Sequence, residues 1–136
     1  MYSAKTQVRV RYAETDKMGY VYYGNYAMYY EVARVEALRK IGFVYRDLED
    51  MGILMPVIES KIRYLKPALY DELLTINVTI SQLPGVKIIF TYEITNEEEE
   101  LINTGETTLV FIDAKTNRPT RMPDVLKKLF NPFFNG

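Results

Sequence analysis

The residues best suited to chemistry stand near the start of the chain, in the segment TDKMGYVYYGNY (15–26). Asp16 carries a carboxylate that can attack a carbonyl group or activate water once aromatic rings partly remove it from solvent. Tyr23, Gly24 and Asn25 follow at the expected start of a helix, where backbone N–H groups lack partners within the helix. Such N–H groups, together with the helix dipole, can stabilise an oxyanion. The segment therefore predicts a site for attack on a carbonyl group.

The same residues also have a purely structural interpretation. Asp-x-x-Gly is a common type I turn with aspartate first and glycine fourth, which fits Asp16 and Gly19. The tyrosines of the segment are of a type that often fills a core. The position of the turn, directly ahead of a long helix, is what favours the catalytic interpretation.

Composition removes several other kinds of chemistry. The chain of 136 residues has no histidine and no cysteine. A Ser-His-Asp triad, a cysteine nucleophile and a zinc site with imidazole or thiolate ligands are therefore excluded, and we expect no metal. The formal net charge is −1, so the basic surplus typical of nucleic-acid binding is missing. No glycine-rich phosphate-loop pattern occurs.

The hydrophobic pattern predicts one long helix, from Asn25 or Tyr26 to Ile41, ended by Gly42. A strand with alternating apolar and polar residues is expected before it, at 7–12. After the helix, apolar and polar residues again alternate in several segments, which predicts further strands. A short helix or turn is expected at 43–52 and a short helix at 122–130. The later strands are expected at 53–65, 72–82, 86–95 and 100–113. Short turns between these strands favour antiparallel pairing, so the fold class is α+β: a curved antiparallel sheet wrapped around one long helix.

The length favours a single domain covering residues 1–136. The first ten residues lack the apolar core of a signal peptide, and no apolar run approaches the ~20 residues of a membrane span. We therefore expect a cytoplasmic protein without a membrane-spanning segment.

Residues 9–42 resemble the hotdog-fold acyl-CoA thioesterases of the hydroxybenzoyl-CoA thioesterase family. The signature of that family, T/C-D-x-x-G-x-V-x-(H/Y)-x-N-Y, stands here as TDKMGYVYYGNY. IRYLKPALYDEL (62–73) and TNRPTRMP (116–123) are similar to two further family segments, in the same order. The resemblance thus extends over nearly the whole chain and implies a hotdog fold.

The resemblance also implies roles for individual residues. Asp16 would be the catalytic carboxylate, acting as nucleophile on the thioester or as general base for water. The backbone N–H of Tyr23 would polarise the thioester carbonyl. Asn25 and Tyr26 would hold the loop and the helix start, and Glu31 would face the acyl group.

Coenzyme A would enter as part of the substrate, with no separate cofactor. The resemblance places its phosphates near Gly85, Val86 and Lys87 and near Arg118, because phosphates favour basic groups and backbone donors. Further cations stand in or beside the second segment, and these weaker candidates are Lys61, Arg63 and Lys66.

The implied function is hydrolysis of an acyl-CoA thioester to a carboxylic acid and free coenzyme A. The alternative is a binding module that holds acyl-CoA or acyl-carrier protein without turnover. Dehydratases of the same fold use a histidine, which this chain lacks. The resemblance further implies a homodimer with active sites between subunits, paired into a homotetramer.

Overall fold

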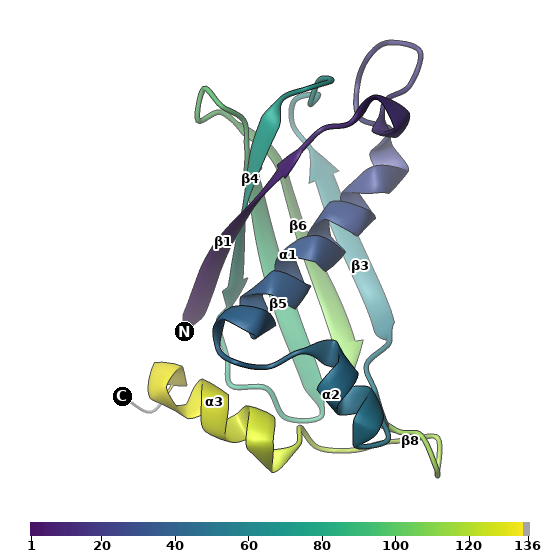
Figure 1. The fold of residues 1–136 in the computed structure, drawn as a ribbon, viewed down its shortest axis with the longest axis vertical. Helices are drawn as coiled ribbons and strands as arrows, with labels where there is room; N and C mark the ends of the chain where they lie inside the picture. Colours follow the sequence, from purple (N-terminus) through teal and green to yellow (C-terminus); the bar gives the residue numbers. More distant parts are fainter. Residues whose placement is uncertain (135–136) are drawn as a thin grey trace.

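The computed structural model describes residues 1–134, so the last two residues of the predicted domain lie outside it. One long helix, α1 (Tyr26–Lys40), crosses a five-stranded antiparallel sheet (Figure 1). Along the sheet the strands follow the order β1-β4-β5-β6-β3. Their bounds are β1 (Tyr2–Arg9), β3 (Val57–Tyr64), β4 (Leu73–Ile80), β5 (Lys87–Thr95) and β6 (Leu101–Val110).

The smaller elements flank this sheet. Two short 3₁₀ turns lie ahead of the long helix, a second sheet has the strand order β2-β7-β8, and two further helices complete the chain. Their bounds are η1 (Tyr12–Glu14), η2 (Tyr23–Asn25), α2 (Tyr45–Asp50), α3 (Asp124–Phe134), β2 (Ile53–Leu54), β7 (Ile112–Asp113) and β8 (Arg118–Pro119). No helix within residues 1–134 is both long enough and apolar enough to cross a membrane.

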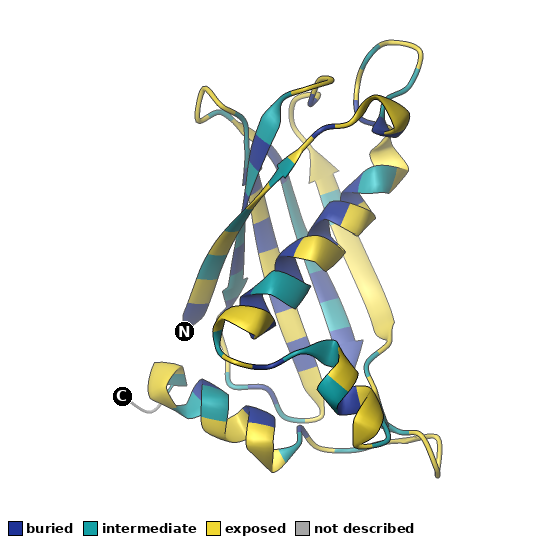
Figure 2. Cartoon of the chain, in the orientation of Figure 1, coloured by how far each residue is buried: buried dark blue, intermediate teal, exposed yellow. Residues whose placement is uncertain are grey.

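The core forms between α1 and the inner face of the sheet. In β4 and β5 every second residue is buried, as the alternating sequence predicts. On α1 the residues Tyr26, Tyr30, Ala33 and Ala37 form a buried stripe at helical spacing. Gly105 of β6 is required beneath this helix, because a Cβ atom there would lie 2.4 Å from the ring of Tyr30. Figure 2 shows that the outer side of α1 stays exposed.

Three predicted boundaries differ from the structure. The first strand runs over Tyr2–Arg9 and not 7–12, because its length is set by antiparallel pairing with β4, from Tyr2 opposite Ile80 to Arg9 opposite Leu73. The predicted strand 53–65 is divided into β2 and β3 at Pro56, which has no N–H group for a ladder. The predicted strand 100–113 is likewise divided, since β7 leaves β6 to pair with β2 and β8.

Candidate active site

The loop between β1 and α1 is tied to the helix by a buried carboxylate, that of Glu14. The backbone N–H of Arg11 donates to its Oε1 at 2.9 Å, and the Arg11 guanidinium donates to its Oε2 at 2.8 and 2.9 Å. The Tyr29 hydroxyl of α1 donates to Oε1 at 2.8 Å. Burial alone would raise the pKa of Glu14, but these hydrogen bonds outweigh it and lower the pKa. The loop therefore enters the helix in one fixed geometry.

Asp16 stands in the turn that its sequence suggests. The backbone N–H of Gly19 donates to the Asp16 carbonyl at 3.0 Å, and Gly19 adopts the positive φ of 79° that the turn requires. One carboxylate oxygen, Oδ1, accepts the N–H groups of Met18 at 2.8 Å and Tyr20 at 3.2 Å. Within residues 1–134 the other oxygen, Oδ2, accepts no hydrogen bond. The turn therefore orients Asp16 and leaves one oxygen for a ligand.

Asp16 lines a cavity of about 350 Å³ between the loop, the start of α1 and the end of β3. Its walls are mainly aromatic and apolar, which lowers the local polarity around the carboxylate. Tyr23 and Tyr64 meet edge to face across it at 6.3 Å, and the Tyr64 hydroxyl donates to the Tyr23 carbonyl at 3.3 Å. The lining residues are Asp16, Met18, Tyr20, Val21, Tyr23, Tyr26, Tyr64, Leu65, Lys66 and Pro67.

The helix entrance supplies backbone donors to the same region. η2 leads directly into α1, and in the part of the chain that the structure describes the Tyr23 N–H donates no hydrogen bond. Asn25 does not cap the helix with its side chain. Its Nδ2 instead donates to the Glu14 carbonyl at 2.9 Å, which ties the entrance to the preceding loop. Tyr23, whose N–H has no partner within residues 1–134, thus lines the same cavity as Asp16.

Tyr26 anchors the first turn of the helix. Its ring is buried between Tyr29 and Tyr64, with centroid distances of 5.9 and 5.6 Å. Burial raises the pKa of the Tyr26 hydroxyl, so this group stays neutral at physiological pH. Tyr26 therefore forms a rigid, uncharged wall of the cavity.

The remaining predicted site residues do not join Asp16 within one chain. Glu31 is exposed on α1 outside the residues that line the cavity. Gly85, Val86 and Lys87 lie at the start of β5, and Arg118 lies in β8; both places are at the end of the sheet opposite the Asp16 loop (Figure 1).

The three weaker cation candidates have different surroundings. Lys66 lines the Asp16 cavity and forms an ion pair with Glu100. Lys61 pairs with Glu59 at 3.0 Å. Lys61 and Arg63 both line another cavity, at β3 and β6. Of the three, Lys66 alone lies beside the predicted chemistry.

Sequence reasoning missed Glu14, whose carboxylate accepts hydrogen bonds from Arg11 and Tyr29. Its signal was the spacing of Arg11 and Glu14, since a carboxylate three residues after a helix cap can bond back to the cap N–H. Within residues 1–134 no three carboxylates come close enough together to hold a metal ion. The site therefore consists of one carboxylate, backbone donors and aromatic walls.

An antiparallel sheet curved around one long helix is the architecture of the hotdog fold. The family described as the thioesterase-like superfamily matches residues 10–130, and the chain belongs to it. The predicted fold and the predicted membership of the hotdog-fold thioesterases are both confirmed.

Two curated bacterial proteins are similar along most of the chain. The putative acyl-CoA thioesterase YneP of Bacillus subtilis is 36% identical over 119 residues, covering 88% of this chain and 86% of YneP. The acyl-CoA thioester hydrolase YbgC of Escherichia coli is 34% identical over 116 residues, covering 85% of this chain and 87% of YbgC. Both relatives are named as enzymes that act on acyl-CoA.

Two solved structures show the same architecture at different degrees of identity. The DHNA-CoA thioesterase of Staphylococcus aureus has a TM-score of 0.85 and 37% identity, covering 99% of this chain and 85% of that one. A 4-hydroxybenzoyl-CoA thioesterase has a TM-score of 0.83 and 20% identity, covering 95% of this chain and 99% of that one. At this identity the similarity shows a shared fold and nothing more.

Proposed function

We propose that this protein is an acyl-CoA thioesterase, which converts an acyl-CoA and water into a carboxylic acid and free coenzyme A. One observation carries the proposal: Asp16, which has a carboxylate oxygen without a hydrogen bond within residues 1–134, and Tyr23, which has an N–H without one, line the same cavity. Relatives at 34–36% identity are named as acyl-CoA hydrolases, which supports this assignment.

The chemistry follows from these two groups. Asp16 either attacks the thioester carbonyl carbon, forming an anhydride that water then cleaves, or takes a proton from the attacking water. In both routes the C–S bond breaks, and the sulfur leaves as the thiolate of coenzyme A. The Tyr23 N–H donates to the carbonyl oxygen as negative charge develops on it. Loss of one such donor typically costs ~10²–10³ in turnover.

A homodimer would complete the site. β3 is an edge strand that is exposed almost along its whole length (Figure 2), and such an edge is a template for pairing. Antiparallel pairing of two β3 edges would place the far end of the partner's sheet beside the Asp16 loop. The partner's Gly85, Val86, Lys87 and Arg118 would then hold the phosphates of coenzyme A. Glu31, exposed on α1, would face the acyl group.

Several further expectations belong to the same proposal. Two dimers would associate into a tetramer, coenzyme A would be the only nucleotide involved, and the protein would act in the cytoplasm. The competing function is a binding module for acyl-CoA or acyl-carrier protein, which would use the cavity without turnover.

Thiol release from short, medium, long and aromatic acyl-CoAs tests the proposal, with calorimetric binding measured on the same substrates. We expect release with at least one acyl class. Tight binding of an acyl-CoA without thiol release from any substrate would favour the binding module instead.

A further inference from the structure

The interior of the protein holds a positive charge that no carboxylate neutralises. Arg34 of α1 is only 8% exposed, and within residues 1–134 it forms no ion pair. Its Nε is buried without a hydrogen-bond partner. A buried charge is costly unless it is paired, so an arginine kept in this state indicates a missing anionic partner.

The groups around Arg34 are hydroxyls. Burial opposes its charge, but the nearby Tyr92 and Tyr45 hydroxyls outweigh that effect and raise the pKa of Arg34. The Tyr92 hydroxyl is engaged with Thr107 Oγ1 at 2.5 Å, whereas the Tyr45 hydroxyl is buried without a partner. Burial raises the pKa of Tyr45 to about 12, so this hydroxyl is a neutral donor. Arg34 Nε and the Tyr45 hydroxyl lie close to one another, and within residues 1–134 neither has an acceptor of good geometry, so together they offer two donors to one anion.

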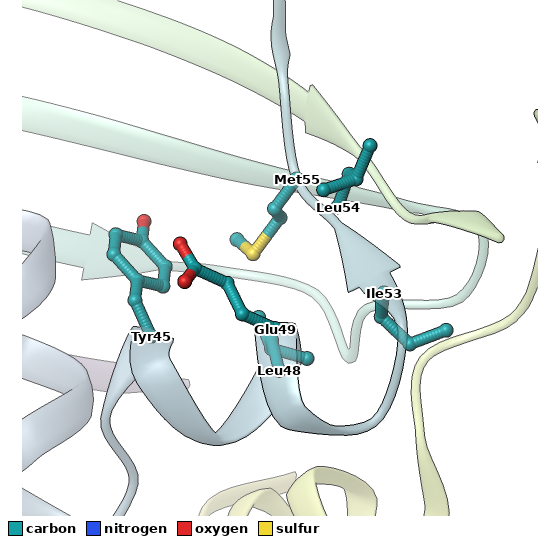
Figure 3. A pocket seen from close by; sticks show the side chains of 6 residues that line it. All are labelled: Tyr45, Leu48, Glu49, Ile53, Leu54 and Met55. Atoms are coloured by element: carbon teal, nitrogen blue, oxygen red, sulfur yellow. The ribbon is translucent and has the colours of Figure 1, made fainter. Parts of the chain in front are cut away.

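A small cavity of about 150 Å³ adjoins Tyr45 (Figure 3). In Figure 3 the Tyr45 hydroxyl, the Glu49 carboxylate and the Met55 side chain turn toward the same space. Glu49 is exposed, so solvent screens its charge, and the rest of the lining is apolar: Leu48, Ile53, Leu54 and Met55. A cavity of this volume, polar at Tyr45 and apolar over much of the remainder, suits the last carbons of an acyl chain and a small polar group at its end.

A strip of exposed sheet face leads from the Asp16 cavity toward Arg34. Tyr64, which lines that cavity, pairs with Asn103, and Ser60 at the other end of the strip pairs with Thr107. Asn103 and Thr107 are buried beneath α1, so these β3 residues share the same face. Asn103 Nδ2, like Arg34 Nε, is buried without a partner. From Tyr26 to Arg34 the helix rises about 12 Å, a distance that an acyl chain of medium length can span.

We propose that Arg34 and Tyr45 bind a carboxylate at the far end of the acyl chain, so that the preferred substrates are ω-carboxyacyl-CoA thioesters. The inference rests on the proposed function, because it places the thioester at Asp16. Glu31 and Glu49 are acidic groups close to Tyr45, and both are exposed and form no ion pair with Arg34 within residues 1–134. A carboxylate from a second copy of this chain is the competing partner for Arg34.

The test compares suberoyl-CoA with octanoyl-CoA, which have equal chain lengths and differ in the terminal carboxylate. Binding is measured by calorimetry in Asp16→Asn protein, so that turnover does not interfere. We expect suberoyl-CoA to bind at least about tenfold more tightly, and Asp16→Asn/Arg34→Leu to lose this preference. Tyr45→Phe, which removes one hydroxyl, should reduce the preference by a smaller factor.

Thermal unfolding of Arg34→Leu without ligand shows whether a loss of binding reflects a loss of folding. Replacing an unpaired buried charge by leucine should leave the melting temperature unchanged or raise it. Equal binding of the two thioesters by the protein with Arg34 would overturn the inference, even if wild type hydrolyses octanoyl-CoA. A lower melting temperature and loss of the oligomer in Arg34→Leu would also overturn it, in favour of a partner's carboxylate. Failure of wild type to hydrolyse any thioester would refute the proposed function alone, because the binding comparison does not need turnover.

Discussion

The buried carboxylate of Glu14 holds the loop that carries Asp16, so its removal should loosen the site. Glu14→Gln removes the negative charge of the acceptor. The hydrogen bonds that Arg11 and Tyr29 donate to this side chain then become neutral-acceptor bonds, which are weaker. Hydrogen bonds to a charged group contribute about 1.5–3 kcal/mol each. The Arg11 side chain is 74% exposed, so solvent largely screens its contribution to the unfolding free energy. We expect the variant to lose about 2–3 kcal/mol of unfolding free energy.

The matched control is Glu36→Gln. Glu36 and Arg39 also form an ion pair three residues apart, at 3.1 Å, but their side chains are 40% and 54% exposed. An exposed pair of this kind contributes about 0–0.5 kcal/mol. Urea unfolding followed by circular dichroism measures both variants. If Glu14→Gln lost as little unfolding free energy as the control, Glu14 would not be what fixes the loop to the helix.

The stabilisation by Glu14 should also depend on pH. Its pKa is lower in the folded protein than in the unfolded chain, so folding favours the charged form. The contribution is therefore complete above the unfolded pKa, ~4.3, and is lost as pH falls through the lower folded value. The stability difference between wild type and Glu14→Gln should shrink in acid and stay constant from pH 6 to pH 8.

Two further changes test packing and assembly. Gly105→Ala should lower the free energy of unfolding by about 1–3 kcal/mol, because the new Cβ would lie 2.4 Å from the Tyr30 ring. An unchanged melting temperature would show that the Tyr30 ring moves aside at no cost. Ile58→Lys, on the exposed strand β3, should convert the proposed dimer to a monomer in light scattering and reduce activity, while an intact and fully active dimer would place the interface elsewhere.

Much of the fold could be predicted because local sequence and tertiary packing agree. The alternation in 72–82 and 86–95 matches β4 and β5, whose alternate residues are buried beneath α1. The extent of β1 could not be predicted, because strand length depends on a partner that is distant in sequence. A proline near a strand start is tolerated, so Pro56 alone did not predict the break between β2 and β3, which depends on the pairing of β2 with β7.

The candidate site could be predicted only where its residues are close in sequence. Asp16, Tyr23 and Tyr26 come together because a single loop carries them. Arg34 gave no signal, since an arginine within a helical pattern is ordinarily an exposed residue, and its isolation depends on neighbours from α2 and β5. Contacts between distant segments decide such burial, and spacing in the sequence does not reveal them.

The measurement that tests the central claim most directly is turnover of the best acyl-CoA substrate by Asp16→Asn beside Asp113→Asn. Asp113 makes the same kind of turn, its Oδ1 accepting the Lys115 N–H at 2.8 Å, but it lies in β7 outside the cavity. We expect turnover to fall at least ~100-fold in Asp16→Asn and to stay unchanged in Asp113→Asn, with both variants folded. Full activity in folded Asp16→Asn would contradict the assignment of Asp16 as the catalytic carboxylate.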